Sequence, residues 1–177
     1  MSFDAYLLFT QASKSGIHPK GESKLKTNAI TLGDEWSFSL ENKLNITSHT
    51  AGAGAGKAEF EAFSIRKQVD TASADLFVAC GSGAHFDNVQ LVLLKSTGDK
   101  GAGTQAQSNV FLTWTFSMLA VERIEWSYGD PAPDESIVFR FGACKIAYKK
   151  QDKTGQLADA GESAWSQIAN SATDKVT

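Results

Sequence analysis

The sequence has only two cysteines, and it lacks any long apolar run. Cys80 and Cys144 are too few for a disulfide framework, and each lies in an apolar stretch where a free cysteine behaves as a small hydrophobic residue. We therefore expect both thiols to be free. Because no stretch approaches the length of a membrane-spanning helix, we also expect no membrane insertion.

Basic residues do not outnumber acidic ones. Lysine and arginine total 17 against 20 aspartate and glutamate residues, and the formal net charge is −3. The basic residues are also not clustered, whereas a nucleic-acid-binding surface needs a concentrated positive patch. The composition therefore predicts no nucleic-acid partner.

The N-terminus lacks the features of a cleavable secretion signal. Residues 1–9 contain no basic segment, and Asp4 interrupts the apolar stretch. We expect the protein to be cytoplasmic on synthesis. Any export must then use a route that does not read a signal peptide.

Residue types with catalytic potential are present but are not grouped. His18, His49 and His85 are far apart, and the sequence has no His-x-x-His or Cys-x-x-Cys spacing, so neither a zinc site nor a Cys-His nucleophile is predicted. The run from Gly52 to Lys57 is one residue too short for a phosphate-binding loop, and a strand pattern follows it. We predict no enzyme activity, no metal and no cofactor.

Apolar and polar residues alternate with period two along much of the chain, as expected of strands with one buried face. In residues 35–41, large apolar side chains alternate with Ser37 and Ser39. We expect 110–118 and 120–128 to be neighbouring strands and Ile146 and Tyr148 to point inward. The predicted strands are 3–10, 29–32, 35–41, 59–69, 88–95, 110–118, 120–128, 136–141 and 143–149, of which 88–95 is apolar on both faces.

One short helix is predicted at about residues 73–81. Ser73 is the expected N-cap, and Leu76, Phe77 and Cys80 are expected to share the buried face. A glycine at position 81 or 83 ends the helix. Because so short a helix needs packing, we expect it to cover a flank of the sheets.

These patterns predict an all-β fold with one helix, an antiparallel barrel or sandwich of about eight or nine strands. The chain of 177 residues fits a single domain spanning 1–177. Residues 42–57 form a long extended connection. Residues 152–177 form a polar C-terminal tail, in which Trp165 is the expected anchor.

The order and spacing of several short motifs resemble the Hcp (hemolysin-coregulated protein) family, whose members form the inner tube of the bacterial type VI secretion system. The likeness covers almost the whole chain. It rests on Phe3-Asp4-Ala5-Tyr6-Leu7, Lys20-Gly21-Glu22-Ser23, Trp36-Ser37-Phe38, Ala53-Gly54-Ala55-Gly56-Lys57, Lys67-Gln68-Val69-Asp70-Thr71-Ala72-Ser73, Leu76-Phe77-Val78-Ala79-Cys80, Gly83-Ala84-His85-Phe86, Glu125-Trp126-Ser127 and Trp165.

The resemblance implies a ring of six identical subunits, stacked with other rings into a hollow tube that is expelled. The implied partners are a VgrG-type spike protein, a contractile sheath and effector proteins carried in the lumen. Ser37 matches a lumen-facing strand of the family, and Ser39 follows it on the same predicted face. The implied ring-stacking loop is Asn45, Ile46, Thr47, Ser48, His49, Thr50, Ala51, Gly52, Ala53, Gly54, Ala55, Gly56 and Lys57.

The sequence departs from the family pattern at three places. The turn 13–19 is longer, Ala74 replaces a common proline, and 24–29 lacks the usual histidine. These departures leave two possibilities open: the protein is a main tube subunit, or it is a specialised paralogue of one. The alternative function is an effector-binding chaperone module, or a protein like a phage tail tube without a role in secretion.

Overall fold

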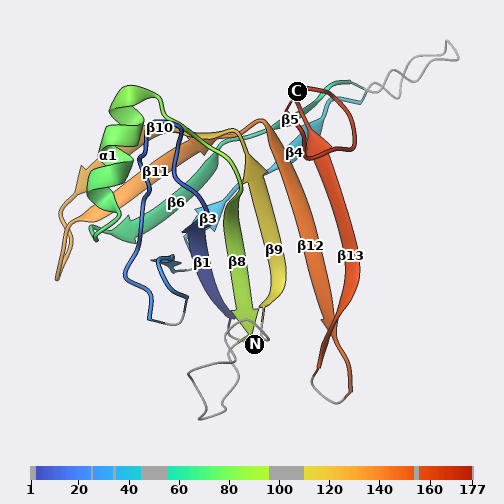
Figure 1. Ribbon diagram of the computed structural model, residues 1–177, viewed down its shortest axis with the longest axis horizontal. Coiled ribbons are helices and arrows are strands. Elements are labelled where there is room, and N and C mark those ends of the chain that lie inside the picture. The colour runs from blue at the N-terminus through green and yellow to red at the C-terminus, as the bar shows by residue number, and fades with distance from the viewer. Residues whose placement is uncertain are drawn as a thin grey trace, which may run out of the picture.

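Two antiparallel β-sheets pack face to face, and one helix, α1 (Ser73–Ser82), covers a flank (Figure 1). The computed structural model describes residues 3–24, 26–33, 35–44, 56–95, 110–153 and 156–176. Within these residues the fold is almost entirely antiparallel β with one short helix, which confirms the predicted fold class.

A six-stranded sheet and a five-stranded sheet form the two layers, and a two-stranded sheet is not joined to either by strand pairing. The six-stranded sheet has the order β13 (Leu157–Ser166), β12 (Ala143–Gln151), β9 (Val110–Ser117), β8 (Val89–Lys95), β1 (Phe3–Phe9) and β2 (Ile30–Leu32). The five-stranded sheet has the order β3 (Trp36–Ser37), β6 (Phe63–Gln68), β11 (Asp134–Arg140), β10 (Leu119–Ser127) and β7 (His85–Phe86). The small sheet pairs β4 (Leu40–Asn42) with β5 (Ala58–Phe60).

Aromatic side chains fill the space between the two layers. Phe63 of β6 stacks on Phe116 of β9 with ring centroids 4.8 Å apart, so the two sheets meet at this pair. Phe38 makes edge contacts with both rings. Stacked and edge-to-face rings add to the free energy gained by burying their area. The core is therefore formed by the inward-facing side chains, which are every second residue of each strand.

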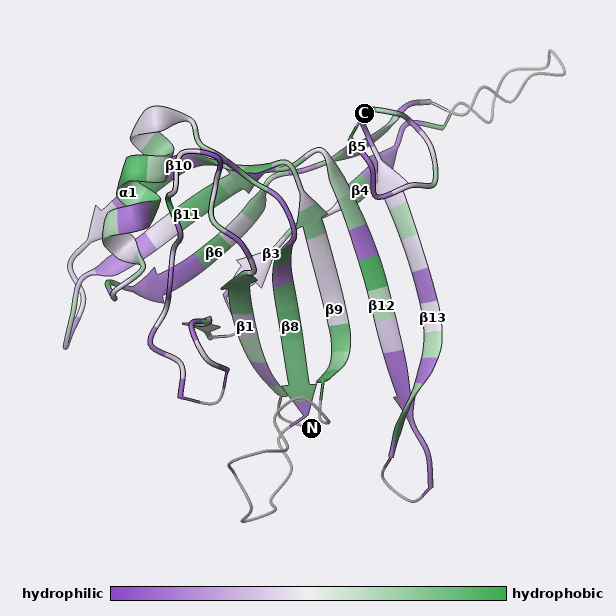
Figure 2. Ribbon diagram, viewed as in Figure 1, coloured by the Kyte–Doolittle hydropathy of each residue, from purple (hydrophilic) through white to green (hydrophobic). Residues whose placement is uncertain are grey.

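Strand β8 is apolar on both faces along its middle, as predicted, and Figure 2 shows this stretch in green between hydrophilic residues near its two ends. Leu91 and Leu93 face the main core. Val92 and Leu94 belong to a second, smaller cluster that also contains Tyr6. Burial on two sides explains why this strand shows no polar alternation.

Two predicted strands are each broken in two. The predicted strand 35–41 divides between β3 and β4, and the predicted strand 59–69 divides between β5 and β6. The two breaks, at Ser39 and at Glu61, lie side by side: the backbone N–H of Glu61 donates to the carbonyl of Ser39 at 3.0 Å. Both chain segments leave the five-stranded sheet together and continue as the small sheet.

The predicted pairing of 110–118 with 120–128 is wrong. Strand β9 pairs with β8 and β12, whereas β10 pairs with β7 and β11 in the other sheet. Met118 lies between them with a φ of 54°, and its N–H donates to Asp87 Oδ1 at 3.2 Å. This left-handed residue turns the chain from one layer to the other.

The predicted polar tail contains a ten-residue strand, so the sequence-based description of 152–177 is wrong for 157–166. Strand β13 pairs along its length with β12, and Trp165 lies opposite Cys144. Its side chains are mostly exposed. Backbone hydrogen bonding to β12, which leaves no hydrophobic pattern in the sequence, therefore holds this edge strand.

Helix α1 differs from its prediction in two details. Ser73 makes no capping hydrogen bond to the helix backbone, since its hydroxyl is directed at other side chains. Phe77 is exposed, and Leu76 and Ala79 are the buried residues of the helix. Gly83 ends the helix in the left-handed conformation, as expected.

The two sheets are offset, so each extends beyond the other at one side. Strands β12 and β13 lie at the side of the molecule opposite α1, β10 and β11 (Figure 1). On β12, Cys144 is buried, but Ile146 and Tyr148 on the same face are 40% and 45% exposed. Their predicted burial is therefore wrong for the single chain, because the second layer does not cover this part of the sheet.

We predict opposite effects for alanine at two glycines. A Cβ at Gly21 would meet the backbone carbonyl of Ala29, so Gly21→Ala should lower the free energy of unfolding. Gly81 lies within α1 with nothing near its Cβ position. Gly81→Ala should raise that free energy by about 0.5–1 kcal/mol, because alanine favours helix. Urea denaturation measures both, and a stabilising Gly21→Ala would contradict the close approach.

Candidate functional site

The outer face of the five-stranded sheet carries small hydroxyl side chains on adjacent strands. Ser37 on β3 lies directly opposite Ser64 on β6. Ser136 on β11 lies opposite Arg66, the next outward residue of β6. We call the surface formed by Ser37, Ser64 and Ser136 the serine face. Period-two alternation places these residues outward because Trp36, Ile65 and Ile137 face the core.

The serine face forms a shallow hollow of about 480 Å³. Its charged lining residues are two arginines and two glutamates: Glu35, Arg66, Arg123 and Glu125. The hollow therefore has balanced charge. The hollow is wide and shallow, so it resembles an open protein surface more than an enclosed ligand pocket.

Each of the three arginines of the chain lies on this outer face and has a carboxylate partner. Arg66 contacts Asp134 at 2.8 Å and Glu35 at 3.3 Å. The hydrogen bond with Asp134, together with the charge of Glu35, raises the pKa of Arg66. The cations of this surface are thus already neutralised within the chain.

Ser37 and Ser39, the two predicted lumen residues, have different surroundings. Ser37 lines the hollow. The hydroxyl of Ser39 donates to Glu61 Oε2 at 2.8 Å, beside the start of the small sheet, and Ser39 is not among the residues that line the hollow. The structure thus places only Ser37 with the other serines.

Most of the predicted ring-stacking loop, residues 45–55, lies outside the described residues. Its two ends are described, and they leave the fold as the pair β4 and β5. Gly56 packs on the carbonyl of Lys43 so closely that a Cβ would collide with it. The base of the connection is therefore a tight antiparallel ladder.

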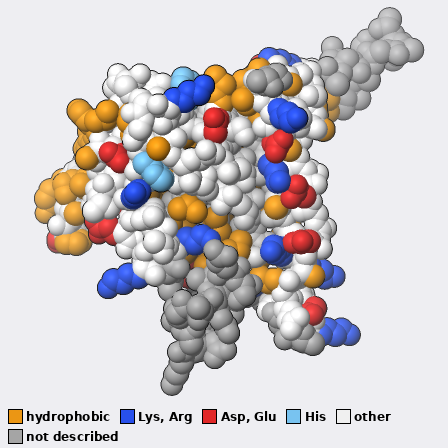
Figure 3. Space-filling model, in the orientation of Figure 1, with side chains coloured by type: hydrophobic (Ala, Val, Ile, Leu, Met, Phe, Trp, Pro, Cys, Tyr) orange, Lys and Arg blue, Asp and Glu red, His pale blue; other side chains and the backbone are white. Residues whose placement is uncertain are grey.

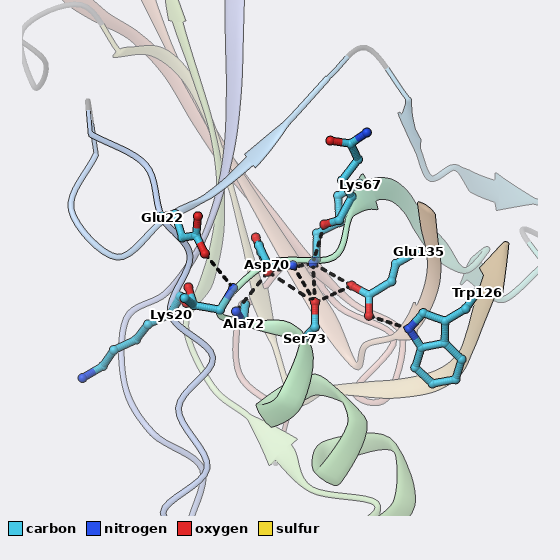
Figure 4. Close-up of polar contacts among 10 residues, drawn as sticks. Lys20, Glu22, Lys67, Asp70, Ala72, Ser73, Trp126 and Glu135 are labelled. Atoms are coloured by element: carbon cyan, nitrogen blue, oxygen red, sulfur yellow. Dashed lines mark hydrogen bonds and ion pairs between the residues drawn. The ribbon is translucent and has the colours of Figure 1, made fainter. Parts of the chain in front are cut away.

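A buried polar network that was not predicted from the sequence lies beneath the start of α1 (Figure 4). Lys67 Nζ lies 2.6 Å from Glu135 Oε2, and these side chains are 2% and 0% exposed. Lys67 also contacts Asp70 Oδ1 at 2.8 Å and Ser73 Oγ at 3.1 Å. Burial of charge is tolerated only when such partners replace water.

The carboxylate of Glu135 has a donor on each oxygen. Ser73 Oγ donates to Oε2 at 2.8 Å, and the indole Nε1–H of Trp126 donates to Oε1 at 2.7 Å. The network thus joins β6, β11, β10 and the first turn of α1. It fixes where the helix sits on the sheet and how the Trp126 ring is oriented.

The loop at residues 20–22 is attached to the same region. Thr71 donates its hydroxyl to the carbonyl of Lys20 at 2.8 Å and its backbone N–H to Glu22 Oε1 at 3.1 Å (Figure 4). Two motifs far apart in the sequence, 20–23 and 67–73, therefore meet. The burial of Lys67 could have been predicted from the period-two pattern of β6, because Lys67 follows Phe63 and Ile65 at the inward positions.

The described residues show no arrangement for metal binding, since no three His, Cys, Asp or Glu side chains group together there. His18 bonds through Nε2 to the carbonyl of Phe9, and His49 lies outside the described part. Both cysteines are free thiols, as expected. Burial raises the pKa of Cys144 to about 12, so its nucleophilic thiolate is suppressed.

Among the described residues, no helix has the length and apolar character needed to cross a membrane.

We predict that the buried ion pair matters mainly when one partner is removed. Lys67→Met leaves the Glu135 carboxylate buried without its cation and should lower the free energy of unfolding by about 3–5 kcal/mol. Lys67→Met with Glu135→Leu should recover most of this loss, because no charge is left unpaired. Chemical denaturation measures both variants.

The matched control removes an exposed ion pair. Arg123 and Glu125 are 3.6 Å apart, and both side chains are 62% exposed. Arg123→Met should therefore change the unfolding free energy by only about 0–1 kcal/mol. Equal losses for Lys67→Met and Arg123→Met would contradict the burial of the pair.

Several solved structures share this fold across nearly the whole chain. A structure described as a type six secretion system protein has a TM-score of 0.78 at 25% identity, covering 97% of this chain and 100% of that one. Hcp1 from Salmonella typhimurium has a TM-score of 0.67 at 23% identity, covering 98% and 100%. A type VI secretion system effector from Yersinia pestis has a TM-score of 0.62 at 20% identity, covering 92% and 99%.

No curated protein matches the sequence significantly. The model of the family described as "Type VI secretion system effector, Hcp" matches residues 11–148, which is well over half of the chain. The match includes the serine face and the buried network. The chain therefore belongs to the Hcp family of type VI secretion system effectors.

Proposed function

We propose that this protein is the structural subunit of a hollow type VI secretion tube, built from stacked rings of six copies. The serine face lines the lumen, and effector proteins are carried against it. The tube leaves the cell through the secretion apparatus, with a spike protein at its tip and a contractile sheath around it. The protein has no catalytic role.

The observation that carries this proposal is the character of the serine face. Small hydroxyl groups and paired charges present hydrogen-bonding capacity without a deep pocket or a concentrated field. Such a surface offers weak and replaceable contacts, because each polar group stays solvated or internally paired when cargo leaves. A wall of this kind suits cargo that must be held and then released.

The connection at 45–57 is proposed to join successive rings. Its base is the antiparallel ladder of β4 and β5, and its sequence from 51 to 56 is only glycine and alanine. A segment with little side chain approaches another backbone closely and pairs with a strand edge. Because the contact uses few buried side chains, the stacking interface is weaker than the ring interface.

We predict that ring formation and ring stacking are separable. The intact protein should form annular particles with six times the 19.0 kDa mass of the chain, together with stacks of these rings at high concentration. Deletion of residues 50–56 should leave single rings and remove stacks and secretion. Negative-stain imaging and mass photometry measure both properties.

A variant with 50–55 replaced by glycine and serine of equal length, and with Gly56 kept, is the matched control for the deletion. Partial stacking by this control is expected, since backbone contacts persist. A monomeric wild-type protein at all concentrations would overturn the proposed function. Unfolding of the deletion variant would contradict the placement of the loop outside the core.

We predict that Ser37→Gln changes effector retention several-fold without changing ring mass, because the longer side chain projects into the hollow. Ser39→Gln is the matched control, since Ser39 bonds to Glu61 and does not line the hollow. The measurement is the amount of effector that copurifies with tagged rings. Equal retention by wild type and Ser37→Gln would remove Ser37 from the cargo surface.

A further inference from the structure

We propose that neighbouring copies in the ring join through two specific apolar surfaces at opposite sides of the chain. The first, the helix patch, consists of Phe77, Val78, Trp126 and Tyr128. The second, the sheet shelf, consists of Leu112, Trp114, Ile146 and Tyr148. The helix patch of one copy docks on the sheet shelf of the next, and Trp126 is its anchor. This inference rests on the proposed ring.

The helix patch is an exposed aromatic cluster. Phe77, Trp126 and Tyr128 are 61%, 50% and 93% exposed, and the rings of Phe77 and Trp126 have centroids 6.1 Å apart. Figure 3 shows hydrophobic side chains gathered over α1 and the adjacent ends of β10 and β11. Aromatic residues clustered on a surface are the usual energetic centre of protein interfaces.

The sheet shelf lies on the inner face of the six-stranded sheet, where the second layer ends. Ile146 lies opposite Trp114, and Tyr148 lies opposite Leu112, so the four side chains form two adjacent cross-strand pairs. All four are partly exposed, although they continue the core face of β9 and β12. A core face without its covering layer requires a partner to complete it.

The charges beside the two surfaces are complementary. Asp75 is one helical turn from Val78, and Asp130 follows Tyr128 by two residues. Lys150 lies two residues beyond Tyr148 on the same face of β12. Within the described residues no ion pair engages Asp75, Asp130 or Lys150. A contact between patch and shelf therefore brings free acids toward a free lysine.

The same charges disfavour other pairings between copies. Two helix patches placed together would oppose Asp75 and Asp130 with their own counterparts, and two shelves would oppose two lysines. Patch and shelf also lie at opposite sides of the fold, α1 on one side and β12 on the other (Figure 1). A contact between two different surfaces is head-to-tail, and this type of contact generates a ring when the rotation between neighbouring copies closes.

The buried network prepares Trp126 for this role. Its indole N–H is held by Glu135 at 2.7 Å, and Glu135 is held in turn by Lys67 and Ser73. The ring is thus fixed although half of its surface is exposed. A side chain that is ordered before docking loses less conformational entropy on binding. Glu135 acts here as a positioning residue.

Complementation between two broken surfaces tests the contact. Phe77→Asp removes the patch and Tyr148→Asp removes the shelf, and neither position is buried. Each variant alone should be a folded monomer by mass photometry and circular dichroism. An equimolar mixture should form one-to-one dimers, because the intact patch of the Tyr148→Asp chain meets the intact shelf of the Phe77→Asp chain.

The outcomes separate this inference from the proposed function. Ile168→Asp, at a residue that is also half exposed but belongs to neither surface, should keep the ring. A wild-type protein that never forms rings would overturn the proposed function itself. A wild-type ring that persists in either variant, or a mixture without dimers, would overturn the patch-and-shelf contact alone.

A pair of double variants tests the positioning by Glu135. Lys67→Met with Glu135→Gln keeps an oxygen that accepts the Trp126 N–H, whereas Lys67→Met with Glu135→Leu removes it. At matched thermal stability, the concentration at which half of the rings dissociate should be several-fold higher for the leucine variant. Equal dissociation of the two variants would show that Glu135 supports only the fold.

Discussion

The structure depends on an incomplete overlap of its two β-sheets. Each sheet buries one face against the other, yet neither covers the whole of its partner. At one side α1 closes the exposed part of the five-stranded sheet, and at the other side Ile146 and Tyr148 remain open to solvent. Hydrophobic burial, the largest favourable term in folding, is thus unfinished within one chain. In the ring that we propose, the free part of one sheet overlaps the helix side of the next copy and completes this burial.

Buried polar groups fix the relative positions of the elements in this arrangement. The ion pair of Lys67 and Glu135 contributes little net stability compared with apolar residues of the same size, because both charges lose their hydration. Its effect is on geometry, since it holds α1, the loop at 20–22 and the Trp126 ring in one relative position. On the other face of the same sheet, serines and paired charges form the charge-balanced surface that we propose for cargo. In the proposed tube, the inner face of this sheet serves assembly and its outer face serves transport.

Alternation along single strands was the most reliable information in the sequence. It placed Ser37 outward beside an inward Trp36, and it showed that β8 is buried on both faces. Alternation did not predict the features that depend on contacts between distant parts of the chain. Met118 adopts a left-handed conformation that no glycine signals, so the change of sheet was missed. Strand β13 is held by backbone pairing that leaves no hydrophobic pattern, and Lys67 shows its burial only through the position it shares with Phe63 and Ile65.

A density map of the assembled wild-type particle at side-chain resolution tests the central claim most directly. We predict that Trp126 and Phe77 of each copy pack on Tyr148 and Ile146 of its neighbour, with Ser37 facing the central opening. A ring in which Trp126 remains solvent-exposed, or in which the outer face of the five-stranded sheet points away from the opening, would contradict it.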